Sequence, residues 1–186
     1  MSGRRMQTLG WLLCAGLAAC ATRVGHPVPG GPSFESDEFR FVGPTGWEVR
    51  PSTAVFLGGH QQIRVYLANQ PLQPDCTQAG PRITCQSPLR DGLRPGGMLV
   101  VWSAGTCVAD TCDLPLAPLI AIGNRQGVSV PMSQGCEETG FTERTAYYVT
   151  VSPQRMDILF TCARDPSHAT RSAFLGFLDA IHWRVP

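Results

Sequence analysis

Six cysteines follow residue 20, and no other feature of the sequence restricts the fold as much. Their positions are Cys76, Cys85, Cys107, Cys112, Cys136 and Cys162. Zinc sites need closely spaced Cys and His ligands, but the chain has no Cys-x-x-Cys and no histidine near a cysteine pair. An even number of cysteines in an exported chain implies a disulfide framework, whose connectivity the spacing leaves open. We therefore expect a disulfide-bonded domain with no metal site and no cofactor.

The first residues have the pattern of a secretory signal peptide. Arg4 and Arg5 precede an apolar run, residues 9–19, that ends in small side chains. Even when the run is extended to Ala21, it is shorter than the roughly 20 residues that a helix needs to cross the hydrocarbon core of a bilayer. We expect residues 1–19 to direct export and then to be removed.

The end of this run, Leu17-Ala18-Ala19-Cys20, resembles the lipobox of bacterial lipoproteins. The resemblance implies cleavage before Cys20 and a thioether from its thiol to diacylglycerol. Acyl chains such as palmitate would then anchor the exported chain to the cell membrane, and the lipid bilayer would be a partner through Cys20. Two or more acyl chains on one protein give stable anchoring, since each buried CH₂ contributes roughly 0.8 kcal/mol. The alternative is ordinary cleavage after Ala21, because Ala19-Cys20-Ala21 also fits a small-x-small site.

Composition divides the rest of the chain into a linker and one domain. Residues 20–37 contain the Cys20 anchor and a Gly/Pro-rich segment without apolar periodicity, which predicts a flexible tether. Residues 38–186 are long enough for a single globular domain with its own core. The chain has 15 basic and 14 acidic residues, and this balance is not that of a nucleic-acid-binding protein.

Alternating and continuous apolar runs predict a sheet. The expected strands are residues 38–42, 53–57, 62–68, 82–84, 98–102, 127–131, 145–152 and 154–163. Glycines 58 and 59 with His60 predict a hairpin between the second and third of these. In the strand at 145–152, Tyr147, Val149 and Val151 share one face.

The chain ends with a predicted helix and a short edge strand. Asp165 is expected as the N-cap and Pro166 in the first turn. An amphipathic apolar face follows, made of Ala173, Phe174, Phe177, Leu178 and Ile181. Residues 182–185 would form the edge strand. The fold class is therefore α+β, a mainly antiparallel β-sheet with a C-terminal helix packed on one face.

Two local disulfides are compatible with this pattern. A Cys76–Cys85 bridge would close a loop around the short strand at 82–84. A Cys107–Cys112 bridge would close a loop after the strand at 98–102, whose unbroken apolar run predicts burial on both faces.

Three stretches, 43–47, 93–100 and 160–166, resemble a broad group of exported proteins of high-GC Gram-positive bacteria. In that group the cysteine before the last helix pairs with one about 26 residues upstream, which implies a Cys136–Cys162 bridge here. The order of elements is also similar to the PsbP/Mog1-like fold, an antiparallel sheet flanked by helices. Neither resemblance implies an activity.

No phosphate-binding loop, dinucleotide fingerprint, metalloprotease helix or Gly-x-Ser-x-Gly elbow is present, and we assign no catalytic residue. Trp102 is expected in the core, and Trp47 and Trp183 either there or in a ligand pocket. The favoured hypothesis is a non-enzymatic domain that binds an envelope protein or a small apolar ligand beneath or beside the last helix. The alternative is an envelope hydrolase that uses His60 or His182 with a nearby Ser or Asp.

Overall fold

The computed structural model describes residues 30–52, 61–79, 82–107, 112–134, 136 and 139–184. The predicted signal peptide (residues 1–19), Cys20 and most of the predicted tether lie outside these residues. So do the predicted strand at 53–57 and the hairpin with His60.

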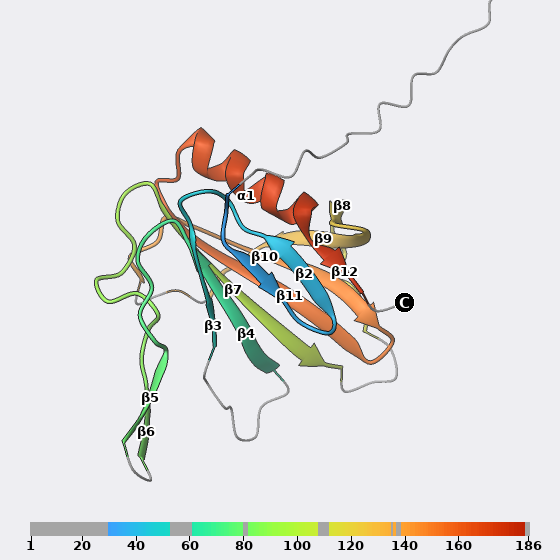
Figure 1. Ribbon diagram of the computed structural model, residues 1–186. Coiled ribbons are helices and arrows are strands. Elements are labelled where there is room, and N and C mark those ends of the chain that lie inside the picture. Colours follow the sequence, from blue (N-terminus) through green and yellow to red (C-terminus); the bar gives the residue numbers. More distant parts are fainter. Residues whose placement is uncertain are drawn as a thin grey trace, which may run out of the picture.

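The described residues form three antiparallel sheets and one α-helix (Figure 1). The largest sheet has the order β3(Glu48–Pro51), β4(Gln61–Ala68), β7(Gly97–Thr106), β11(Arg155–Arg164), β10(Glu143–Ser152), β9(Arg125–Pro131), β8(Leu119–Ile122). A small sheet has the order β1(Ser33–Glu35), β2(Phe39–Val42), β12(His182–Trp183). The remaining elements are the hairpin β5(Cys76–Ala79)–β6(Arg82–Cys85) and helix α1(His168–Ala180). The predicted α+β class is confirmed, as is the short terminal strand β12, which lies at one edge of the small sheet.

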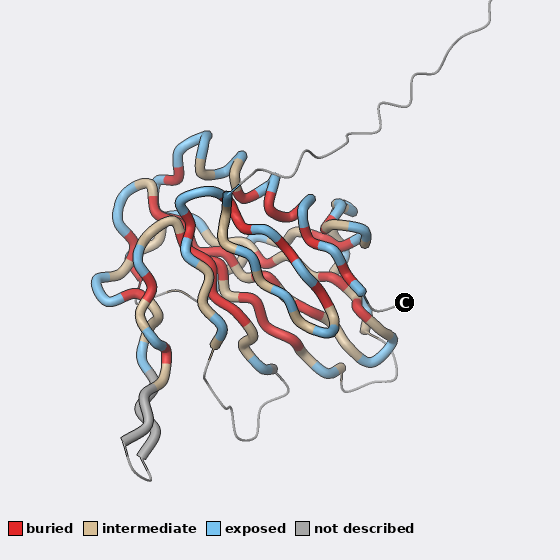
Figure 2. The backbone as a smooth tube through the Cα atoms, viewed as in Figure 1, coloured by how far each residue is buried: buried red, intermediate tan, exposed pale blue. Residues whose placement is uncertain are grey.

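The helix and the small sheet cover the same face of the large sheet, which we call the inner face (Figure 1). Side chains from the helix and both sheets form one buried cluster. Buried and exposed residues alternate along β2, whereas β7 is buried over most of its length (Figure 2). Its members from the large sheet include Val65, Leu67, Val100, Trp102, Val149, Val151 and Leu159. The predicted face of β10 is confirmed, since Val149 and Val151 are buried in this cluster and Tyr147 packs against it.

The opposite, outer face carries a second, smaller cluster. Leu72, Leu89 and Leu93, from the loops on either side of β5–β6, pack there with Leu99 of β7. Strand β7 is therefore buried on both faces, as its unbroken apolar run predicts.

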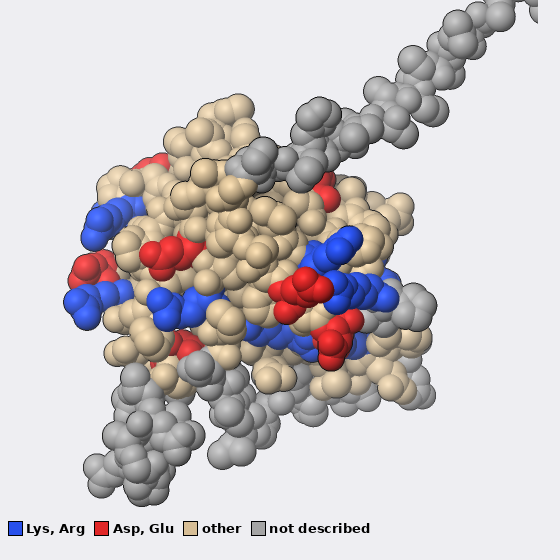
Figure 3. Space-filling view, in the orientation of Figure 1, with Lys and Arg blue, Asp and Glu red and all other residues tan. Residues whose placement is uncertain are grey.

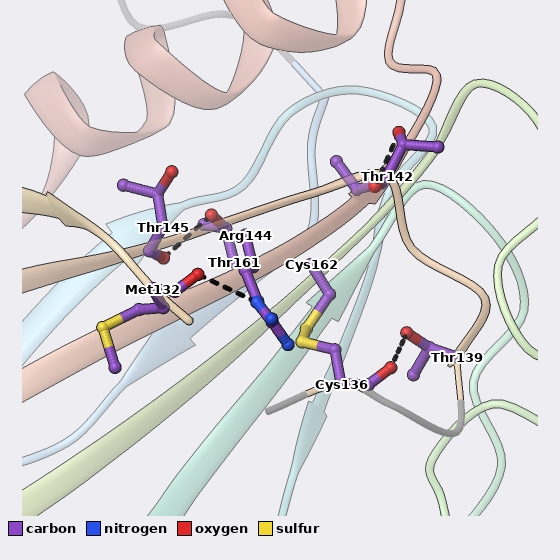
Figure 4. Close-up of a disulfide and its surroundings, with 9 residues drawn as sticks. Met132, Cys136, Thr139, Thr142, Arg144, Thr145, Thr161 and Cys162 are labelled. Carbon is purple, nitrogen blue, oxygen red and sulfur yellow. Dashed lines mark hydrogen bonds between the residues drawn. A yellow bond between two sulfur atoms is a disulfide. The ribbon is translucent and has the colours of Figure 1, made fainter. Parts of the chain in front are cut away.

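Two of the expected disulfides are present. Cys136 and Cys162 are bridged with a Cα–Cα distance of 6.1 Å, and Cys107 and Cys112 with 5.4 Å. Figure 4 shows the first of these on the outer face of β11, where it holds the segment that leads into β10. Disulfides persist in oxidising compartments, so these bridges indicate an extracytoplasmic environment.

The Cys76–Cys85 bridge remains a prediction. Cys76 is disulfide-bonded, and the β5–β6 register places the Cα atoms of Cys76 and Cys85 opposite each other. The side chain of Cys85 lies outside the described part of the chain.

The helix begins two residues later than expected. Its N-cap is Ser167, whose hydroxyl accepts a hydrogen bond from the Thr170 N–H at 3.1 Å. Asp165 instead has a positive φ of 45°, and its N–H donates to Thr142 Oγ1 at 2.8 Å. Asp is among the few side chains that enter this left-handed region readily. The prediction of Asp165 as the N-cap and Pro166 in the first turn is therefore wrong, because Asp165 turns the chain after β11.

Candidate binding cavity beneath the helix

The N-terminal half of α1 does not close onto the inner face. A cavity of about 160 Å³ lies between this half of the helix and strands β7, β10 and β11. Its lining residues are Met98, Glu143, Thr145, Tyr147, Thr161, Ala163, Arg171, Phe174 and Leu175. This is the position beneath the last helix where the sequence predicts a binding site.

Small side chains on neighbouring strands produce the hollow. The strand register places Thr145 opposite Thr161, and Ala163 between Glu143 and Met98. The Thr161 hydroxyl donates to the Thr145 carbonyl at 3.0 Å (Figure 4). This polar group of the cavity floor is therefore satisfied within the sheet.

Aromatic rings and a thioether form the walls. Tyr147 and Phe174 meet edge to face, with ring centroids 5.1 Å apart, and Met98 is buried. Burial raises the pKa of the Tyr147 phenol, and the nearby positive charge of Arg171 only partly opposes this rise. Tyr147 is thus a neutral aromatic wall at physiological pH.

An ion pair lies at the mouth of the cavity. Both terminal nitrogens of Arg171 donate to the Glu143 carboxylate, and hydrogen bonding from Arg171 lowers the pKa of Glu143. Both side chains are more than 40% exposed, and solvent screens exposed ion pairs so that they add little to stability. The pair can therefore separate at little cost. Leu175, which is 54% exposed, lies at the same rim.

The volume limits what the cavity can hold. An apolar cavity of about 150 Å³ in another protein binds benzene, whereas sites for drug-sized ligands measure roughly 300–1,000 Å³. The 160 Å³ cavity therefore has room for one phenyl or branched alkyl group.

Trp47, Trp102 and Trp183 lie in the core rather than in this cavity. Trp102 is fully buried, as predicted, and Trp47 and Trp183 are 7% and 2% exposed. The indole N–H of Trp183 donates to the Ile122 carbonyl at 3.0 Å. Both residues that the sequence left undecided are therefore structural.

A buried charge network joins the two sheets on the inner side, and the sequence interpretation missed it. The Asp157 carboxylate is fully buried and accepts hydrogen bonds from Trp102 Nε1 at 2.9 Å and from Arg155 Nε at 2.9 Å. Arg155 also pairs with Glu38, which pairs with Arg64. A signal was present, because strand alternation places Asp157 on the same face as Leu159.

Both arginines of this network, Arg64 and Arg155, are paired with carboxylates. On the face seen in Figure 3, basic and acidic side chains lie beside one another rather than in separate patches. Burial alone would raise the pKa of Glu38, but hydrogen bonds from Arg64 and Arg155 outweigh it and lower the pKa. The network is a structural link and not an anion-binding site.

The two histidines within the described ranges do not form a hydrolase site there. His168 and His182 are both exposed. His168 Nδ1 lies 3.5 Å from Ser172 Oγ, and no carboxylate completes the arrangement among the described residues. His60, the other candidate, lies outside them.

The same part of the chain contains no group of three or more His, Cys, Asp or Glu side chains arranged to hold a metal ion. Its one helix is too short to span a membrane.

Comparison with known proteins finds no relative: no family model, curated protein or solved structure matches the chain. The interpretation of the cavity therefore depends on its own geometry.

Proposed function

We propose that this protein is an exported lipoprotein whose domain binds an apolar group in the cavity beneath α1, without catalysing a reaction. The lipobox-like sequence at Leu17–Cys20 supports the membrane anchor, and the two disulfides support export. The proposed ligand is one phenyl or branched alkyl group, carried by an envelope protein or by a small apolar molecule.

The observation that carries the binding proposal is the cavity itself. It combines apolar walls from Met98, Tyr147 and Phe174, a volume that matches one aromatic ring and an exposed ion pair that can separate. Interface hot spots often consist of a single large side chain inserted in a pocket of this kind. The exposed Leu175 beside the mouth gives a partner protein a second apolar contact.

Benzene tests the cavity. A ligand that binds only the folded state raises the melting temperature with its concentration, so benzene should raise the melting temperature of the mature chain. Ala163→Leu should abolish the rise, because the larger side chain occupies the cavity. Ala169→Leu adds the same group at an exposed position on α1 and should leave the rise unchanged. An equal rise in Ala163→Leu would refute binding at this cavity.

Apolar peptides and short-chain lipids then distinguish the two sources of the group. Competition with benzene by phenylalanine-containing peptides alone would indicate a protein partner. Competition by branched short-chain lipids alone would indicate a small ligand.

Membrane fractionation tests the anchor. Cys20→Ser should move the mature chain from the membrane to the soluble fraction, because the serine hydroxyl cannot form the thioether. Cys14→Ser is the matched control, since it changes the cysteine within the signal peptide and should leave the chain on the membrane. Membrane retention of Cys20→Ser would contradict the anchor while leaving the cavity test unaffected.

A further inference from the structure

The two edges of the large sheet differ in how they are protected. Edge strand β3 carries Glu48 and Arg50 and ends at Pro51. Charges and proline are the usual means by which edge strands avoid pairing with other chains. The opposite edge, β8, has the sequence Leu-Ile-Ala-Ile, with neither charge nor proline.

The hairpin geometry leaves some backbone N–H and C=O groups of β8 outside the β8–β9 ladder. Gly123 and Asn124 form a two-residue turn between Ile122 and Arg125, and Gly123 has the positive φ that such turns need. Ile122 and Arg125 therefore form the first hydrogen-bonded pair. Because bonded and non-bonded pairs alternate along an antiparallel ladder, the N–H and C=O groups of Leu119 and Ala121 point away from β9.

Apolar side chains flank these groups. Leu119 is 64% exposed, and Leu116, three residues before it, is fully exposed. The register aligns Leu119 with Val128 of β9, and Val128 with Tyr148 of β10, on the outer face. An exposed edge with adjoining leucines has the features of a strand-addition surface.

We propose that the β8 edges of two copies of this chain pair antiparallel and join the two large sheets. The two-fold axis of such a pair is perpendicular to the sheet, so the inner faces of both copies lie on the same side. The described chain starts at Gly30, immediately before β1, which belongs to the small sheet on the inner face (Figure 1). The Gly30 ends of both copies therefore lie on the same side of the joined sheet, which is compatible with both Cys20 anchors in one membrane.

The choice of a second copy of this chain as the partner of the β8 edge rests on the proposed lipid anchor at Cys20. Copies confined to one membrane surface meet at a high effective concentration, which favours even a short strand pairing. A strand from another protein would also explain the exposed edge. Pairing of two copies explains in addition why the edge lies where both Gly30 ends come to the same side of the joined sheet.

Photo-crosslinking tests the pairing. The full lipidated chain, with p-benzoylphenylalanine in place of Leu116, is reconstituted in phosphatidylcholine vesicles and irradiated. The unlipidated Cys20→Ser mature chain is irradiated in parallel in concentrated solution. Pairing of Leu119 with Ala121 of the other copy places Leu116 opposite residue 124, so we expect adducts between two copies that map to β8 and the turn after it, residues 119–126. The same photo-crosslinker in place of the exposed Leu175 should give none, since Leu175 lies at the rim of the cavity over β10 and β11 and not at the end of α1 that contacts the β8–β9 turn.

Two variants separate edge pairing from misfolding. Ala121→Pro removes an outward N–H that the β8–β9 ladder does not use, so folding should persist and the adduct should fall about tenfold. Gln126→Lys places a charge one strand away from the edge and should leave the adduct unchanged.

Absence of the adduct in both preparations, or an undiminished adduct in Ala121→Pro, would overturn the pairing. An adduct in solution together with membrane release of Cys20→Ser would support both proposals. An adduct in solution without membrane release would support the pairing and refute the anchor.

Discussion

The two halves of helix α1 lie on the same sheet but pack differently. At the C-terminal half, Phe177 meets Phe41 of the small sheet edge to face at 5.1 Å, and the adjacent Phe39 stacks on Trp102 of the large sheet with ring centroids 4.0 Å apart. Beneath the N-terminal half, Ala163 and Thr161 leave the 160 Å³ cavity. Helix and strands continue through both regions, so the difference lies in side-chain size.

This contrast shows that the cavity is not a sign of general underpacking. The packed part of the inner face, where the small sheet lies on the large sheet, contains a buried carboxylate with its hydrogen bonds satisfied and several fully buried large side chains. That part can hold the helix in place and so permit a hollow at the other end. The following predictions test this division, from the largest expected effect to the smallest.

Removing the buried carboxylate should be the most damaging change. Asp157→Ala leaves the Arg155 guanidinium and the Trp102 indole N–H without a shared acceptor. Breaking one side of a buried pair costs about 3–5 kcal/mol. Urea unfolding should show a loss of this size, and Asp179→Ala, at an exposed helix position, should show almost none. A small loss in Asp157→Ala would mean that the packed half does not dominate stability.

The two described disulfides should differ in their contributions. In the chain-entropy model a bridge stabilises more when it closes a longer loop, about 3.5 kcal/mol for the Cys136–Cys162 separation of 26 and about 2 kcal/mol for the Cys107–Cys112 separation of 5. Replacing each pair by alanine and measuring the free energy of unfolding compares them.

Cys162 also lies between the floor residues Thr161 and Ala163, so loss of its bridge should weaken benzene binding. Loss of the Cys107–Cys112 bridge should leave binding unchanged. Equal effects on binding would show that the bridge does not support the cavity.

Enlarging a side chain should have opposite effects at the two ends. Ala163→Leu fills the hollow and should stabilise the fold by about 0.5–2 kcal/mol, as cavity-filling changes commonly do. Val149→Leu adds a methylene in a fully buried position and should destabilise it by about 1–3 kcal/mol through overpacking. Thermal unfolding measures both, and two changes of the same sign would contradict the contrast.

Acid should have the smallest specific effect. The pKa of Glu38 is lowered in the fold, since the hydrogen bonds from Arg64 and Arg155 outweigh burial. Its stabilising contribution is therefore present above the unfolded pKa of about 4.3 and is lost as the pH falls through the lower folded value. The difference in stability between pH 7 and pH 3 should be smaller in Glu38→Gln than in the parent chain. An unchanged difference would show that Glu38 is not coupled to these arginines.

The elements with strong local patterns could be predicted from the sequence. Alternation identified β10 and β11, and the helical period identified the face with Phe174 and Phe177. Strand β3 was missed, because Glu48-Val49-Arg50-Pro51 has only one apolar residue and so no alternating pattern. Its extended conformation is stabilised by antiparallel pairing with β4, which the local sequence does not reveal.

The site could be predicted only in its general position. The helix period shows which side faces the sheet, but the hollow depends on Thr145, Thr161 and Ala163 meeting across two strands. That meeting is set by register, which the pattern of one strand does not contain. The Asp157 network likewise could not be predicted, because it depends on a contact between Glu38 and Arg155, which are far apart in the sequence.

Crystals of the mature chain pressurised with xenon would test the central claim most directly, since xenon enters apolar cavities of this size. We predict a xenon site beneath the N-terminal half of α1, bounded by Thr161, Ala163 and Phe174, and no site beside Trp102. Ala163→Leu should remove it. An empty cavity, or a xenon atom among the aromatic rings of the C-terminal half, would contradict the division between a hollow and a packed end.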